Sequence, residues 1–265
     1  MFKNNMTPNS LPERVFQLGT YLSKNAASLT DLREYFTLDS VKSDALSDTL
    51  TAARELDLLI ETGTNCSLKV NPIIFESMDA FRTYCNSKVF ADHDSLFYKV
   101  SQVMLNLYET REGRSLTCVS FTSGKFESYM RERVYSMNNI NQNMRGWRFW
   151  ASFLGLGVIT KPKKDLFIFM PNMFINLQDA IVNSKIPSGT YTIREFINYI
   201  EPYCSEALPE PGSMQFNLGM SNGLRCLDDF NIAKVTSEND AQETWIISEI
   251  KTHKLQSTVS HIQIK

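Results

Sequence analysis

The spacing of apolar residues predicts three helices in the first part of the chain. Apolar residues three and four apart share a helix face, and Val15, Leu18 and Leu22 follow Leu11-Pro12 at this spacing. Capping residues, and acids in a first turn, mark where further helices begin. The predicted starts are Leu11, then Ser28 or Thr30, then Ser40 or Ser43.

A helix followed by an apolar strand, a polar connector and a second strand occurs three times, at residues 51–70, 149–170 and 223–250. The first two copies align at an offset of 100 without a gap from about residue 50 to residue 81. In that frame Asp79-Ala80 faces Asp179-Ala180. The alignment predicts a duplicated helix–hairpin unit with a more divergent third copy.

Three helices followed by a β-hairpin resemble the winged-helix family, in which a helix-turn-helix carries the hairpin as its wing. The resemblance implies an α+β, mostly helical chain of three tandem winged-helix domains. The chain also resembles accessory multi-winged-helix proteins of bacterial DNA-modification and phage-defence systems in its layout. The short sequence segment that carries this resemblance is the opening LPERV…YL. The predicted domains are residues 10–91, 92–190 and 191–265.

Charge distinguishes the middle copy from the other two. Residues 92–172 carry eleven basic and seven acidic side chains, a net charge of +4. Residues 13–70 have a net charge of −3, and residues 191–265 one of −4. Neutralising phosphates supplies most of the non-specific affinity for nucleic acid, so only the middle copy has the right sign. We therefore expect it to bind nucleic acid, and double-stranded DNA in particular.

The segment 138–154 separates into two faces when it is projected on a helix. Ile140, Met144 and Trp147 form an apolar stripe, and amides and arginines lie opposite. Asn and Gln can pair with adenine and Arg with guanine in the major groove. The predicted wing, 160–165, adds lysines at a hairpin tip. The predicted contacts are Arg131, Arg133, Asn141, Gln142, Arg145, Arg148, Lys161, Lys163 and Lys164.

Two other interpretations stay open. A polar stripe on an amphipathic helix is often only solvated, with no partner. Phe149 is the one apolar residue on the polar side, and an exposed aromatic is typical of a protein interface. Together with the two acidic copies, it supports an adaptor or scaffold subunit that assembles a multi-subunit ATPase or defence machine. Both functions predict protein partners in a larger complex.

The sequence contains no recognisable catalytic constellation, so we expect no enzyme activity, no cofactor and no metal. The three histidines are far apart, and no P-loop, GxSxG or HExxH motif is present. Five scattered cysteines without a CxxC pair and a polar start predict a reduced, cytoplasmic protein. No apolar run approaches the roughly 18 residues of a membrane helix, so no membrane partner is expected.

Overall fold

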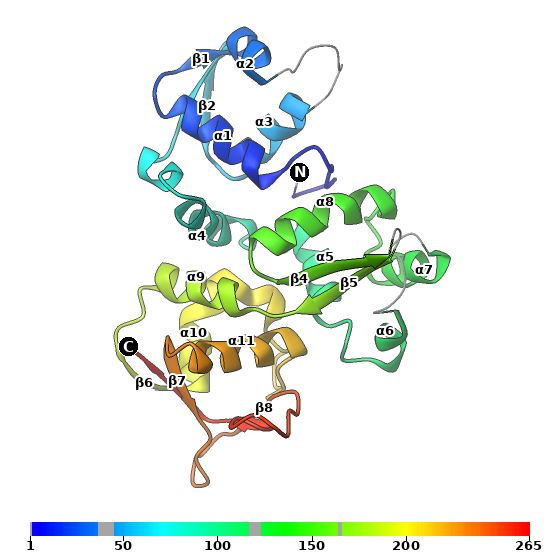
Figure 1. The fold of residues 1–265 in the computed structure, drawn as a ribbon, viewed down its shortest axis with the longest axis vertical. Coiled ribbons are helices and arrows are strands. Elements are labelled where there is room, and N and C mark those ends of the chain that lie inside the picture. Colours follow the sequence, from blue (N-terminus) through cyan, green and yellow to red (C-terminus); the bar gives the residue numbers. More distant parts are fainter. Residues whose placement is uncertain (1, 37–44, 117–122, 164–165) are drawn as a thin grey trace.

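The computed structural model describes residues 2–36, 45–116, 123–163 and 166–265, with the backbone alone described at 161–163 and 166–167. The structure is α+β, with helices over about half of the chain and small antiparallel sheets (Figure 1). This confirms the predicted α+β class. No helix in the described ranges is both long enough and apolar enough to cross a membrane.

The N-terminal part of the chain forms the predicted helices and hairpin, and the predicted start of the third helix, Ser40 or Ser43, lies outside the described residues. Its elements are α1 (Pro12–Leu22), β1 (Ala27–Ser28), α2 (Leu29–Phe36), α3 (Ala45–Glu55), β2 (Leu59–Thr62) and β3 (Asn65–Leu68). Proline suits the first turn of a helix, where its missing N–H would have no partner, and α1 begins at Pro12. The β2–β3 turn contains Gly63 at φ +62°, a conformation that glycine adopts without strain. The three strands pair in the order β1-β3-β2.

The C-terminal part repeats this order of elements. Its elements are α9 (Phe174–Ser184), β6 (Gly189–Thr192), α10 (Ile193–Cys204), η2 (Ser205–Ala207), α11 (Leu218–Asp229), β7 (Ala233–Thr236) and β10 (His261–Ile264). The sheet order β6-β10-β7 matches β1-β3-β2, with the last strand in the centre. Thr192 and Glu195 form a capping box that begins α10.

The predicted hairpin within 223–250 is wrong. β7 pairs with β10 at the end of the chain, while β8 (Trp245–Ile246) pairs with β9 (Thr258–Val259). Burial alternates in β10, where Ile262 and Ile264 point into the core, so this strand fits the half-buried centre of a sheet. Trp245 instead stacks on Phe216, with ring centroids 5.0 Å apart. A long insertion therefore separates the two paired strands.

The middle part contains more helices than predicted. Its elements are α5 (Leu96–Leu105), α6 (Arg111–Leu116), α7 (Gly124–Arg133), α8 (Ile140–Phe153), β4 (Gly157–Lys163) and β5 (Leu166–Pro171). The predicted helix 138–154 is confirmed as α8, which begins two residues later because Asn139 caps it in a left-handed conformation. Its hairpin β4–β5 extends below α8 toward α7 in Figure 1.

The three parts share one hydrophobic core that runs from Phe2 to Ile264. η1 (Pro72–Phe75) and α4 (Met78–Val89) follow the first hairpin, and α4 packs against α9. α9 also packs against α10 and α11, although the predicted domain boundary places it with residues 92–190. At the α4–α9 contact Asp179 is buried and accepts hydrogen bonds from Arg82, Thr83 and Asn86. The three domain ranges stay predictions.

Candidate nucleic-acid interface

One side of α8 is buried, as the helical projection predicts. Trp147 and Trp150 have no exposed surface, and both indole N–H groups have acceptors. Trp147 donates to the Ser101 hydroxyl at 3.0 Å, and Trp150 donates to the Ser10 carbonyl at 2.6 Å. The tryptophans therefore hold α8 in the core and are not available to stack on bases.

The N-terminal segment 2–10 covers a second side of α8, which the sequence did not predict. The Met6 backbone N–H donates to the Asn143 side chain at 2.6 Å, so this buried amide faces the protein. The Phe2 ring packs edge-on against the Trp150 ring, with centroids 4.8 Å apart. A Cβ at Gly146 would overlap the Met6 carbonyl, so glycine allows the close approach. Only one long face of α8 remains for a ligand.

The outward face of α8 carries the predicted amides and arginines. Arg145 and Ser152 are exposed, whereas Asn141, Gln142 and Arg148 are half-buried, so the prediction of a fully exposed face is only partly right. The Gln142 side chain accepts a hydrogen bond from the Asn139 amide at 2.8 Å, which ties it to the helix cap. No carboxylate lies on this helix.

The outward arginines influence each other. Burial lowers the pKa of the Arg148 guanidinium, and the positive charge of Arg145 lowers it further. The Arg148 guanidinium lies over the Phe149 ring, 4.6 Å from its centroid. Phe149 is thereby half-buried, which corrects the expectation of an exposed aromatic. Arg145 makes no ion pair with any residue that the structure describes.

The two predicted arginines of α7 differ in their surroundings. Arg133 forms an ion pair with Glu112 at 3.0 Å and lies over the Tyr129 ring at 3.7 Å. Arg131 is exposed and, within the described ranges, has no ion-pair partner. The last turn of α7 thus offers one uncompensated cation beside α8, which packs against it.

The predicted wing lysines cannot be placed. The backbone of β4 runs through Lys161 and Lys163, and Lys163 pairs with Leu166 at the end of the hairpin. The side chains of Lys161 and Lys163, and all of Lys164, lie outside the described residues. They stay predictions.

Tyr135 is a surface residue that the sequence reasoning missed. Its side chain is 90% exposed, in the turn between α7 and α8. It lies between Val134 and Met137, which are buried and hold the turn in place. An aromatic between apolar residues looks like a core residue in the sequence, and only the path of the turn exposes it.

The corresponding helix of the C-terminal part, α11, has no free polar face. Asn217 caps the helix, and Asn222 donates to the Pro171 carbonyl at 3.0 Å. Arg225 is buried and donates to the carbonyls of Leu255, Ser248 and Gln256. The polar residues of α11 therefore serve the fold.

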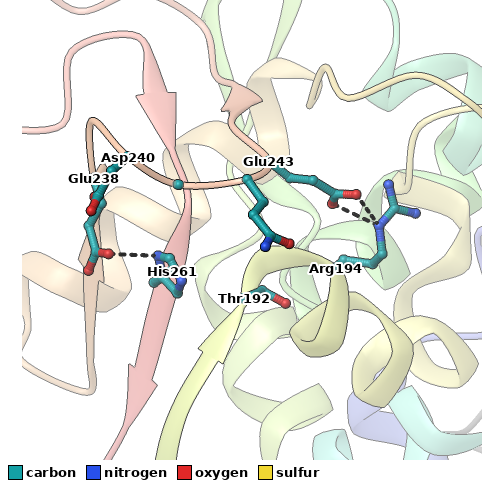
Figure 2. Close-up of a pocket in the computed structure, with 8 residues that line it drawn as sticks. Thr192, Arg194, Glu238, Asp240, Glu243 and His261 are labelled. Carbon is teal, nitrogen blue, oxygen red and sulfur yellow. Dashed lines mark hydrogen bonds and ion pairs between the residues drawn. The ribbon is translucent and has the colours of Figure 1, made fainter.

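A polar pocket of about 420 Å³ lies where α10 begins (Figure 2). Arg194 is engaged by Glu243 at 2.8 Å, and Glu238 lies 3.6 Å from His261. Its remaining charged side chain is Asp240, so the pocket repels phosphate. In the described ranges no three His, Cys, Asp or Glu side chains are grouped to hold a metal ion.

Comparisons with family models, with curated proteins and with solved structures find no match to this chain.

Proposed function

We propose that this protein is a non-catalytic, tandem winged-helix DNA-binding protein. α8 and the hairpin β4–β5 contact double-stranded DNA, and the protein acts within a larger bacterial complex. The shared order of residues 12–68 and 174–264, with the last strand central in each sheet, supports the winged-helix assignment. The helix-then-hairpin order of α8, β4 and β5 supports it for the middle part.

The observation that carries the proposal is the outward face of α8. It has no carboxylate, and it presents Arg145 without an ion pair among the described residues. Exposed Arg131 adds a second cation from the adjacent helix. Such a face attracts phosphates, whereas the acidic pocket at α10 repels them. Arg145 and Arg148 contact the DNA backbone or guanine, and Asn141 contacts a base edge toward the start of the helix.

Fluorescence anisotropy with a labelled 20-base-pair duplex tests this function. Replacing Arg145 with Ala removes one phosphate contact, so the log–log salt slope becomes less steep by about 0.9. Arg131→Ala has the same effect, and in the double variant the log–log salt slope is less steep by about 1.8. Arg194→Ala is the matched control, because this exposed arginine lies in the acidic C-terminal part and is paired with Glu243. Equal binding by the wild type, the two single variants and the double variant would refute the proposal.

An adaptor function is the second candidate, and an exposed aromatic favours it. Phe230 is 67% exposed at the end of α11 and stacks on Phe174 with centroids 5.0 Å apart. An exposed ring that stacks on a half-buried one is typical of a protein contact. Co-elution with products of neighbouring genes, lost in Phe230→Ser and kept in Tyr135→Ser, would support it. If the protein co-elutes with none of these gene products, that result would count against the adaptor function.

A further inference from the structure

A second surface of the N-terminal part combines aromatic rings with uncompensated cations. A groove of about 470 Å³ runs between α1 and the end of α2. Its described lining consists of aromatic, basic and neutral polar side chains: Arg14, Phe16, Gln17, Thr20, Tyr21, Lys24, Tyr35 and Phe36. This lining contains no carboxylate, although residues 13–70 have a net charge of −3.

The rings form a platform that is open on one side. Tyr35 is 62% exposed, and its ring lies 4.4 Å from the Tyr21 ring at an interplanar angle of 39°. The Phe36 ring packs edge-on against the Tyr35 ring, with centroids 5.0 Å apart and an interplanar angle of 71°. Packing on both neighbours holds the Tyr35 ring in one orientation while its outer surface remains in water. A held, exposed ring is suited to stack on a planar group.

The two cations of the groove have no acidic partner. Arg54, Lys69 and Arg82 are each paired with an acid, whereas Arg33 of α2 is exposed and has no ion pair in the described ranges. Among the residues that the structure describes, neither Arg14 nor Lys24 has an ion pair, and Arg14 donates only to the Asn9 carbonyl at 3.0 Å. The groove therefore has two cations available to a ligand, although residues 13–70 have a net charge of −3.

The positions of the cations indicate the size of the ligand. Arg14 lies in the first turn of α1 and Lys24 just beyond its end, ten residues later, or about 15 Å apart at the helical rise. This spacing suits a chain with several phosphates, with one phosphate at each cation. The rings lie between them, where a base would be. Aromatic stacking with a tracked backbone is how single strands bind without sequence preference.

We propose that this groove binds single-stranded nucleic acid, with a base stacked on Tyr35 and backbone phosphates at Arg14 and Lys24. Sequence selectivity is weak, because the Thr20 hydroxyl already donates to the Phe16 carbonyl and Gln17 is the one amide of the described lining. The site is separate from α8, so it does not depend on the proposed contact with duplex DNA.

Anisotropy with fluorescein-labelled dT10 tests the site in the full chain. Tyr35→Ala weakens binding by about 5- to 150-fold, and Tyr35→Phe, which keeps the ring, binds like the wild type. Arg14→Ala combined with Lys24→Ala makes the salt slope less steep by about 1.4. Tyr135→Ala is the matched control, because it removes an exposed tyrosine of the middle part. Tyr35 is mostly exposed, so its variants keep the fold, which circular dichroism verifies.

Two further measurements identify the ligand and distinguish binding at this groove from binding at α8. Thymidine monophosphate competes at least tenfold more weakly than dT10, because it has one base and one phosphate and cannot supply a separate phosphate to each cation. In the Arg145→Ala background, Tyr35→Ala weakens dT10 binding by the same factor as in the wild type. This holds even if Arg145→Ala weakens the binding of duplex DNA. Equal affinity of wild type and Tyr35→Ala for dT10 overturns the inference. So does Tyr35-dependent binding of a labelled peptide of alternating Glu and Phe without binding of dT10.

Discussion

Asp79 and Asp179 align in the internal repeat that the sequence predicts, yet the structure predicts very different effects when each is replaced by Ala. Asp179 is 3% exposed and binds Arg82 at 2.8 Å, Thr83 at 2.7 Å and Asn86 at 2.7 Å. The Asp79 side chain is 81% exposed and, among the described residues, forms an ion pair with Arg82 alone. Both aspartates belong to the contact between α4 and α9.

The expected magnitudes follow from burial. Asp179→Ala leaves a partly buried Arg82 without its inner acid and removes acceptors from Thr83 and Asn86. Breaking a buried pair in this way costs about 3–5 kcal/mol in the free energy of unfolding. Asp79→Ala removes a solvent-exposed ion pair, which costs about 0–1 kcal/mol.

Urea denaturation followed by circular dichroism measures both variants against the wild type. Asp179→Asn is a useful intermediate, because it keeps a side-chain oxygen for Thr83 but loses the charge that binds Arg82. The expected order of stability is wild type, then Asp79→Ala, then Asp179→Asn, then Asp179→Ala. Equal losses for Asp79→Ala and Asp179→Ala would refute the argument that burial distinguishes the two repeats.

Three further predictions concern buried groups. Glu206 is fully buried with no hydrogen bond to its carboxyl oxygens, and burial raises its pKa well above the usual 4.5. The wild-type free energy of unfolding therefore falls by up to about 1.4 kcal/mol per unit as pH rises from 4.5 toward that raised pKa, and Glu206→Gln removes this slope in urea titrations. Burial also raises the thiol pKa values of Cys85 and Cys204. Maleimide at pH 8 therefore leaves both cysteines unlabelled in the folded protein, and detection of either label by mass spectrometry would contradict this prediction. Phe2→Ala costs about 3–5 kcal/mol and exposes Trp150 to a fluorescence quencher, whereas an unchanged quenching constant would show that segment 2–10 does not cover α8.

Local patterns were sufficient for much of the secondary structure and for the composition of the candidate interface. The apolar stripe of α8 was predicted because residues three and four apart share a face whatever the rest of the chain does. The first hairpin was predicted because its two strands and the polar connector between them are adjacent in sequence. The outward position of Arg145 follows from the same periodicity.

Tertiary structure decided how much of each surface is available. Segment 2–10 covers α8 through contacts more than 130 residues apart in sequence, such as Met6 with Asn143, and no local pattern encodes them. β10 lies beside β7 because its alternating isoleucines complete a buried sheet, although a closer strand was available. Asp79 and Asp179 look alike in sequence, and only the packing of α4 on α9 buries one of them. Periodicity sets which side of a helix is polar, because that is local geometry, whereas burial depends on which distant segments compete for the other sides.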